Sequence, residues 1–213
     1  MYRKLNIALV SAYDYALPSG VNNHIENLAA QLRFIGHSVT IFAPASKSII
    51  KNHFVPISNS VAIPTNGSIA RISLSLSSFS KVKSILNQNN FDIVHLHEPF
   101  AGLVPLAFLQ HSKSINIATF HSLRNSKFNS VFKHLKGSKL VKHYYKKIDG
   151  RITISPASEK FISEHFDGKF EIIPNGININ EFSKHLPPIK EIQDGMTNIL
   201  FVGRMEKRKG LKY

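Results

Sequence analysis

Hydrophobic positions along the chain fall into short apolar runs separated by longer amphipathic stretches. The first unit sets the pattern: residues 5–10 are mostly apolar and predict a buried strand. Residues 22–36 repeat apolar positions at the three-and-four spacing of a helix, and Gly36 stands where a helix C-terminal cap is expected. Residues 38–42 predict the next strand. A strand–helix–strand unit with such short connections favours parallel pairing and a right-handed crossover.

The same alternation continues through residue 173. Further strands are predicted at 92–96, 116–120, 151–155 and 170–173, and helices at 78–89, 102–111, 129–147 and about 157–166. We therefore predict an α/β fold with a doubly wound, mostly parallel, Rossmann-like sheet covered by helices on both faces. Ligands bind such sheets at the carboxyl ends of the strands, so the loops after residues 10, 96, 120, 155 and 173 are expected to form one rim.

Two segments of the chain depart from this rhythm. Residues 53–64 and 70–76 alternate like strands and are joined by the turn signal Asn66-Gly67. Residues 183–197 combine prolines, Gly195 and mixed charges, which predicts a linker.

The linker defines the expected domain organisation. We predict a domain over 1–182, the linker over 183–197, and the start of a second domain over 198–213. A strand is expected at 198–202, and one strand with the few residues after it cannot form a core.

Charge is the most unusual feature of the composition. The chain has 27 Lys and Arg against 13 Asp and Glu, a formal net charge of +14. Such a balance fits an anionic partner (nucleic acid, anionic lipid or a phosphorylated substrate) or a solvated Lys-rich surface. The predicted helix at 129–147 is strongly basic with an apolar side, so it either lies on an anionic membrane or covers the sheet with a solvated basic back. No nucleic-acid-binding motif is recognisable, so no nucleic acid partner is expected.

Several classes of protein are disfavoured. The chain has no run of about 18 apolar residues that would span a membrane. Asn6 and Asp14 interrupt the apolar N-terminus and no cleavage site follows, so the cytoplasm is the expected location. The absence of cysteine excludes disulfides and thiolate metal sites, and the lack of G-x-G-x-x-G argues against a nicotinamide enzyme. His95 and His97 share a strand face, but with no evident third ligand we predict no metal site.

Polar motifs occupy the predicted rim loops. Gly20 opens the first helix, where a glycine permits close backbone approach and the helix N-terminus offers N–H groups to an anion. His121 follows a strand and can hydrogen-bond a sugar hydroxyl or a phosphate. Arg204 and Lys209 follow the last predicted strand and suit a pyrophosphate. Each has a structural alternative: an ordinary strand-to-helix turn, a structural histidine, or a basic tail.

In their order, these motifs resemble the retaining glycosyltransferases of family 4, which have the two-domain GT-B fold. The likeness covers essentially the whole chain and is strongest to phosphatidylinositol mannosyltransferases. The motifs that carry it are Pro18-Ser19-Gly20-Val21, His95-Leu96-His97-Glu98-Pro99, Thr119-Phe120-His121, Ile173-Pro174-Asn175-Gly176-Ile177 with Phe182, and Val202-Gly203-Arg204 with Lys209-Gly210-Leu211.

The resemblance implies a hexosyltransferase and assigns roles to residues. The implied catalytic residues are His121, Arg204 and Lys209. The implied donor-binding residues are Gly20, Asn175, Gly176, Arg204 and Lys209, and the implied acceptor-binding residues are Tyr13, Asn22, Ser122 and Arg124. Family members often carry glycine where this chain has Ser19, which should be tolerated if only Gly20 needs an open backbone.

The resemblance also implies partners. The donor would be a nucleotide sugar, GDP-mannose or a UDP-hexose, and a mannose- or glucose-type hexose would go to a lipid-linked or saccharide acceptor with retention. No cofactor is implied, dependence on a divalent metal stays open, and contact with the inner face of an anionic membrane is expected. The acidic motif of the donor half is not in this sequence, so the fragment alone is expected to be inactive. The alternative is a non-catalytic sugar- or lipid-binding module, which the reading frame downstream of Tyr213 would distinguish.

Overall fold

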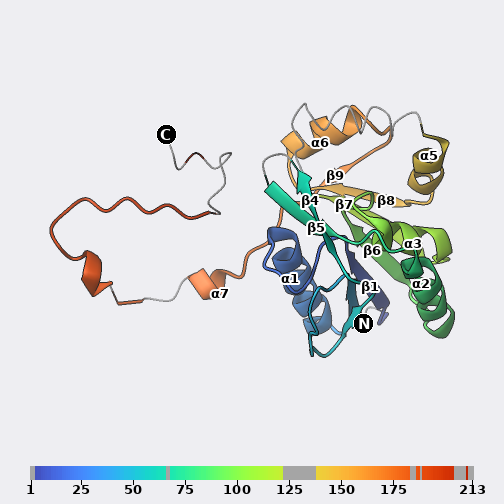
Figure 1. The fold of residues 1–213 in the computed structure, drawn as a ribbon, viewed down its shortest axis with the longest axis horizontal. Coiled ribbons are helices and arrows are strands. Elements are labelled where there is room, and N and C mark those ends of the chain that lie inside the picture. Colours follow the sequence, from blue (N-terminus) through green and yellow to red (C-terminus); the bar gives the residue numbers. More distant parts are fainter. Residues whose placement is uncertain are drawn as a thin grey trace.

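The computed structural model describes residues 3–65, 68–121, 138–182, 186, 187, 189–203 and 210. At its centre is a sheet of seven strands in the order β3-β2-β1-β6-β7-β8-β9, with every neighbouring pair parallel (Figure 1). The strands are β1 Asn6–Ser11, β2 Ser38–Ala43, β3 Phe54–Pro56, β6 Ile93–His97, β7 Ile115–Phe120, β8 Gly150–Thr153 and β9 Glu171–Ile172.

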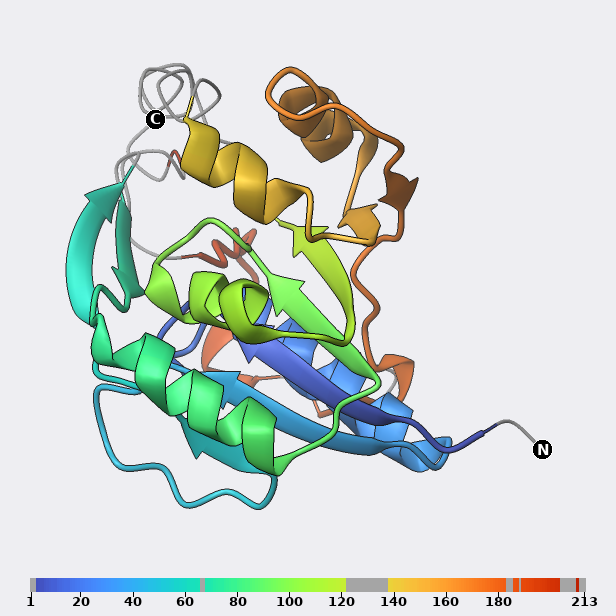
Figure 2. The same cartoon turned by 90° about the vertical axis from the view of Figure 1, so that its right-hand side faces the viewer.

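Helices cover both faces of this sheet. Figures 1 and 2 show α1 on one face and α2 with α3 on the other, which confirms the predicted doubly wound α/β fold. The helices are α1 Gly20–Phe34, α2 Ser77–Gln88, α3 Leu103–His111, α5 Lys139–Tyr145, α6 Pro156–Ser163 and the short α7 Ile179–Phe182, followed by a 3₁₀ turn at Lys190–Ile192. Of the basic helix predicted at 129–147, the part before residue 138 lies outside the described residues.

The first strand shows why the apolar runs are continuous. Ile7 and Leu9 belong to the core beneath α1, whereas Ala8 and Val10 belong to the core that contains Phe108 of α3. Successive side chains of a strand point to opposite faces, so a strand covered on both sides must be apolar at every position.

The strand order places a switch point between β1 and β6. From β1 the chain winds outward to β2 and β3, and then returns to form β6 on the other side of β1. The carboxyl ends lie level, because Ser11 of β1 pairs with His97 of β6, and His97 pairs with Thr119 of β7. The predicted rim is thereby confirmed, and its centre is the crevice where such folds bind ligands.

The prediction of one strand over 53–64 is wrong. The chain forms β3 at the edge of the main sheet and then a separate antiparallel hairpin of β4 Val61–Thr65 and β5 Ser68–Ile72. Phe54 is buried and stacks on Tyr15 at a centroid distance of 4.6 Å, which fixes β3 against the core beneath α1. Alternation along the sequence does not reveal which sheet a strand joins. The turn signal Asn66-Gly67 lies outside the described residues.

The strand predicted at 198–202 is also not formed in this structure. Ile199 and Val202 are 93% and 83% exposed, and Figure 1 shows the segment far from the sheet. A strand needs a neighbour to bond its backbone N–H and C=O groups, and no described strand lies beside this one. The domain boundaries at residues 182 and 197 stay predictions.

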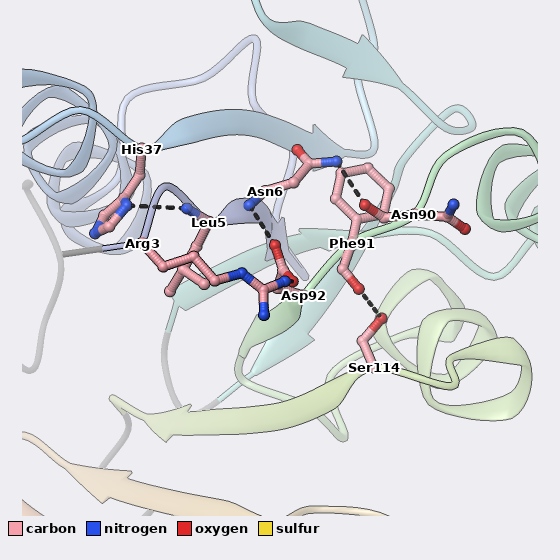
Figure 3. A network of polar contacts seen from close by, with 8 residues as sticks. All are labelled: Arg3, Leu5, Asn6, His37, Asn90, Phe91, Asp92 and Ser114. Carbon is pink, nitrogen blue, oxygen red and sulfur yellow. Dashed lines mark hydrogen bonds and ion pairs between the residues drawn. The ribbon is translucent and has the colours of Figure 1, made fainter.

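The amino end of the sheet is pinned by polar contacts (Figure 3). The Asp92 carboxylate accepts a hydrogen bond from the backbone N–H of Asn6 at 2.8 Å and forms an ion pair with Arg3. The Asn6 side chain donates to the Asn90 carbonyl at 2.8 Å. These bonds tie the start of β1 to the start of β6, so the two strands that flank the switch point are held in register.

Candidate active site

Three histidines from separate elements meet at the switch point. His97 ends β6, His121 follows β7, and His24 lies one helical turn into α1. His97 Nδ1 and His121 Nε2 are 3.0 Å apart and share a hydrogen bond. The His24 ring lies edge-on to both, with centroid distances of 5.5 Å to His97 and 5.1 Å to His121. We call His24, His97 and His121 the histidine cluster.

A fourth histidine supports the cluster from behind. His95 stacks on His97 at a centroid distance of 4.4 Å, and its Nε2 shares a 2.8 Å hydrogen bond with the Thr119 hydroxyl. His95 and His97 therefore do share one strand face, as predicted, and the partner of His95 comes from the neighbouring strand. This packing fixes the orientation of the His97 ring.

The cluster is electrically neutral near pH 7. Burial, followed by repulsion from His24 and His95, lowers the pKa of His121 to about 3. Burial and then the neighbouring His24 lower the pKa of His95 to about 4, and burial first of all holds the pKa of His97 well below its ordinary value. Neutral imidazoles bind ligands through hydrogen bonds or a lone pair, and they contribute no positive charge.

Glu98 holds the backbone of His121. Its carboxylate accepts the His121 N–H at 2.7 Å, and its own N–H donates to the Thr119 carbonyl at 2.9 Å. Glu98 is buried and has a φ of +58°, a left-handed conformation that a residue with a side chain adopts at a cost of roughly 1 kcal/mol. The strained turn at the end of β6 thus places the Glu98 carboxylate against the backbone N–H of His121, just after β7.

Internal hydrogen bonds shape the loop between β1 and α1. Ser19 caps α1 by accepting the Asn22 N–H at 3.0 Å. Asn22 is buried; its side-chain oxygen accepts from Ser11, and its amide nitrogen donates to the Asp14 carbonyl at 2.9 Å. The Asn22 side chain is therefore engaged within the loop, and its contact with an acceptor stays a prediction.

Asp14 ties this loop to two others. Its carboxylate accepts hydrogen bonds from the Ala16 N–H at 2.9 Å, the Ser46 N–H at 3.1 Å and the Ser60 hydroxyl at 2.6 Å. Burial by itself would raise the pKa of Asp14, but these hydrogen bonds outweigh it and lower the pKa below 3.8. The ionised carboxylate is thus the form that the fold stabilises.

Replacing Asp14 by alanine is expected to lower the free energy of unfolding by about 1–3 kcal/mol, because three partly buried hydrogen bonds lose their charged acceptor. Urea denaturation measures the change. Asp14→Asn should lower the free energy of unfolding by less. Its difference from the wild type should be largest above about pH 4 and should shrink as the pH falls, because a carboxylate with a depressed pKa stabilises the fold only while it is ionised. An alanine variant as stable as the wild type would contradict this role.

The structure brings together some of the predicted site residues. Gly20 is the first residue of α1, one turn before His24, and a Cβ added there would meet no protein atom within 4 Å. Gly20 therefore lies on the same rim as His121, whose ring contacts His24 one turn further along α1. Tyr13 follows β1 on the same rim and bridges to Ile72 of the hairpin.

Other predicted site residues are farther away or not described. Asn175 and Gly176 are exposed and follow the edge strand β9, three strands from β6, which corresponds to about 14 Å at the usual strand spacing. Ser122, Arg124, Arg204 and Lys209 lie outside the described residues.

Sequence reasoning missed His24 and Asp14. His24 lies on a helix four residues after Gly20, and only the packing of α1 on β1 and β2 brings its ring to the other two. A histidine spaced one turn from a predicted ligand-binding glycine was the available signal. Asp14 had no comparable signal, because its partners at positions 46 and 60 are distant in the sequence.

Comparison with known proteins identifies the family. The model of "Glycosyltransferase Family 4" matches residues 18–181. The phosphatidyl-myo-inositol mannosyltransferase of Mycolicibacterium smegmatis is 34% identical over 212 residues, which is 97% of this chain and 53% of the relative. The alpha-monoglucosyldiacylglycerol synthase of Acholeplasma laidlawii is 27% identical, with 97% and 57% covered. The chain thus spans about half the length of the curated relatives it matches.

Solved structures show the same architecture. The crystal structure of a glycosyltransferase from Rickettsia africae ESF-5 has a TM-score of 0.56 at 19% identity, and the match covers 88% of this chain and 47% of that one. Sucrose-phosphate synthase from Thermosynechococcus elongatus has a TM-score of 0.56 at 18% identity, with 83% and 49% covered. The predicted Rossmann-like domain of the GT-B type is confirmed, and the chain belongs to glycosyltransferase family 4.

Proposed function

We propose that this chain is the acceptor-side half of a two-domain enzyme that transfers a hexose, of the mannose or glucose type, from a nucleoside-diphosphate sugar to a lipid-linked acceptor with retention of configuration. The names of two relatives, a phosphatidyl-myo-inositol mannosyltransferase and an alpha-monoglucosyldiacylglycerol synthase, support this reaction class. In this proposal, the part of the relatives that this chain does not cover corresponds to the domain with most of the donor site.

The contact of the His121 ring with His24, one turn after Gly20 in α1, carries the proposal. Gly20 leaves the helix N-terminus open, and that terminus favours an anion such as a diphosphate. His121 lies beside it and is neutral, so it suits a hydrogen bond to a hydroxyl of the sugar more than to the diphosphate charge. One side of the rim thus offers a phosphate site next to a sugar site.

Neutral histidines cannot neutralise the negative charge on the departing diphosphate. In this proposal Arg204, Lys209 and the N–H groups around Gly20 stabilise that charge. The acceptor hydroxyl attacks from the face that the diphosphate leaves, and a phosphate oxygen takes its proton. Catalysis then consists of positioning and electrostatic stabilisation.

A lipid-linked acceptor requires contact with a membrane surface. In the part of the chain that the structure describes, no helix has the length and apolar character needed to cross a bilayer. The exposed basic residues Lys139, Lys142 and Lys146 lie in or beside α5, whereas the Lys147 ammonium is held by the carbonyls of Leu109 and Gln110. Each cation near anionic lipid contributes about 1 kcal/mol, so we propose peripheral binding.

Transfer of labelled sugar tests the function. A form of the protein with the second domain, of the length of its relatives, should transfer mannose from GDP-mannose, or glucose from UDP-glucose, to phosphatidylinositol or diacylglycerol in anionic vesicles. Parallel assays with each donor and each lipid identify the pair, and NMR of the product reports the anomeric configuration. An inverted product would overturn the retaining mechanism.

The second candidate is a non-catalytic sugar- or lipid-binding module. Specific binding of vesicles or sugar with no transfer from any nucleotide sugar in the two-domain form would favour it. Binding of neither would refute both candidates.

A further inference from the structure

Two ring nitrogens in the histidine cluster have no partner among the described residues. They are His97 Nε2 and His121 Nδ1, and both are buried. The hydrogen bond between His97 Nδ1 and His121 Nε2 joins one donor to one acceptor. Each neutral ring carries one N–H, so one of the two orphaned nitrogens is an N–H and the other is a bare lone pair. A buried polar atom without a partner calls for a water, an ion or a ligand.

The third ring completes a set of ligands. One nitrogen from each of His24, His97 and His121 lies within 4.8 Å of the others. Zinc bound tetrahedrally at about 2.0–2.1 Å from each nitrogen needs them about 3.3–3.4 Å apart. His97 Nδ1 and His121 Nε2 are already 3.0 Å apart, so an ion bound between them would replace their hydrogen bond and require only small movements of the rings.

The surroundings also suit a metal. His97 is fully buried, whereas His24 and His121 are partly exposed, so an ion would have protein on one side and an open position on the other. The sequence pattern predicts no metal site, because it shows no third ligand beside His95 and His97.

We propose that His24, His97 and His121 form a three-histidine site for a transition-metal ion with a preference for imidazole, of which Zn²⁺ is the prime example. Nitrogen ligands and the lack of a carboxylate in the set disfavour Mg²⁺ and Ca²⁺.

The site has a consequence for catalysis that rests on the proposed function. An ion held by His121 occupies the ring that would otherwise meet the sugar. Zn²⁺ is therefore an inhibitor that competes with the nucleotide sugar, and a chelator restores the activity.

Metal binding to the 213-residue chain tests the site without any donor or transfer assay. Calorimetry of the metal-free protein with Zn²⁺ should show one ion per chain, and Co²⁺ should give the visible absorption of a low-symmetry nitrogen site. His24→Gln keeps a side chain of similar length and should weaken binding at least tenfold, as should His121→Gln. His143→Gln, which changes an exposed histidine on α5, is the matched control and should leave the affinity unchanged.

Circular dichroism establishes that each variant is folded before its affinity is compared. No binding up to millimolar Zn²⁺ would overturn the proposal. Equal affinity in His24→Gln and wild type would also overturn it, because the ion would then bind other histidines. Tight Zn²⁺ binding by the cluster without any sugar transfer in the two-domain form would uphold the metal site and count against the proposed function. The experiments therefore test the two proposals independently.

Discussion

Replacing Arg204 by alanine in the two-domain form is expected to slow hexose transfer by about 10²–10³-fold, which is the usual loss when one preorganised donor to a developing charge is removed. The physical reason is the neutrality of the histidine cluster. His121, with a pKa of about 3, carries no charge at pH 7, so in the proposed mechanism the diphosphate depends on cations from the segment that begins at Arg204.

The loss should appear mainly in kcat, since the charge on the diphosphate grows as the bond to the sugar breaks. Arg204→Lys keeps the charge but loses the bidentate fork, so it should fall between the alanine variant and the wild type. Arg208→Ala removes a neighbouring arginine outside the motif and is expected to change kcat less than threefold. Unchanged activity in Arg204→Ala would refute the role.

Replacing His121 by alanine should lower kcat by about 10²-fold, because the neutral imidazole is proposed to hold a sugar hydroxyl in the transition state. His121→Asn keeps a hydrogen-bonding group and should recover part of the rate. Steady-state kinetics with saturating acceptor measure both variants, and His143→Ala on the surface of α5 is the control.

The pH profile separates this role from that of a titrating acid or base. Since the pKa of His121 is about 3, its protonation falls far below the working range, and the wild type and His121→Asn should show profiles of the same shape between pH 5 and 8. If the wild type instead lost activity around pH 6.5 and His121→Asn did not, His121 would titrate in the enzyme and the neutral role would be wrong. If the variant unfolds at a temperature close to that of the wild type, its lower rate is not caused by loss of the folded structure.

The sequence by itself determined the architecture of the domain. A helix with one buried stripe and a strand buried on both faces have different hydrophobic periods, so the strand–helix alternation could be predicted without any contact. The end of α1 was predictable for the same local reason: Gly36 has a φ of +98°, a conformation that glycine adopts freely. The expectation that polar residues at the strand ends lie on one rim followed from the rule that parallel strands share one functional edge.

Only the tertiary structure decided which of these residues meet. His24 reaches the site because α1 packs against the sheet, and Asn22 turns inward because Ser11 and the Asp14 carbonyl are its nearest partners. Residues 54–65 split between two sheets because Phe54 fits the core beneath α1 while β4 finds its partner in β5. Local periodicity records whether a side chain is buried, but the choice of neighbour depends on contacts between residues far apart in the chain, and no local pattern carries that information.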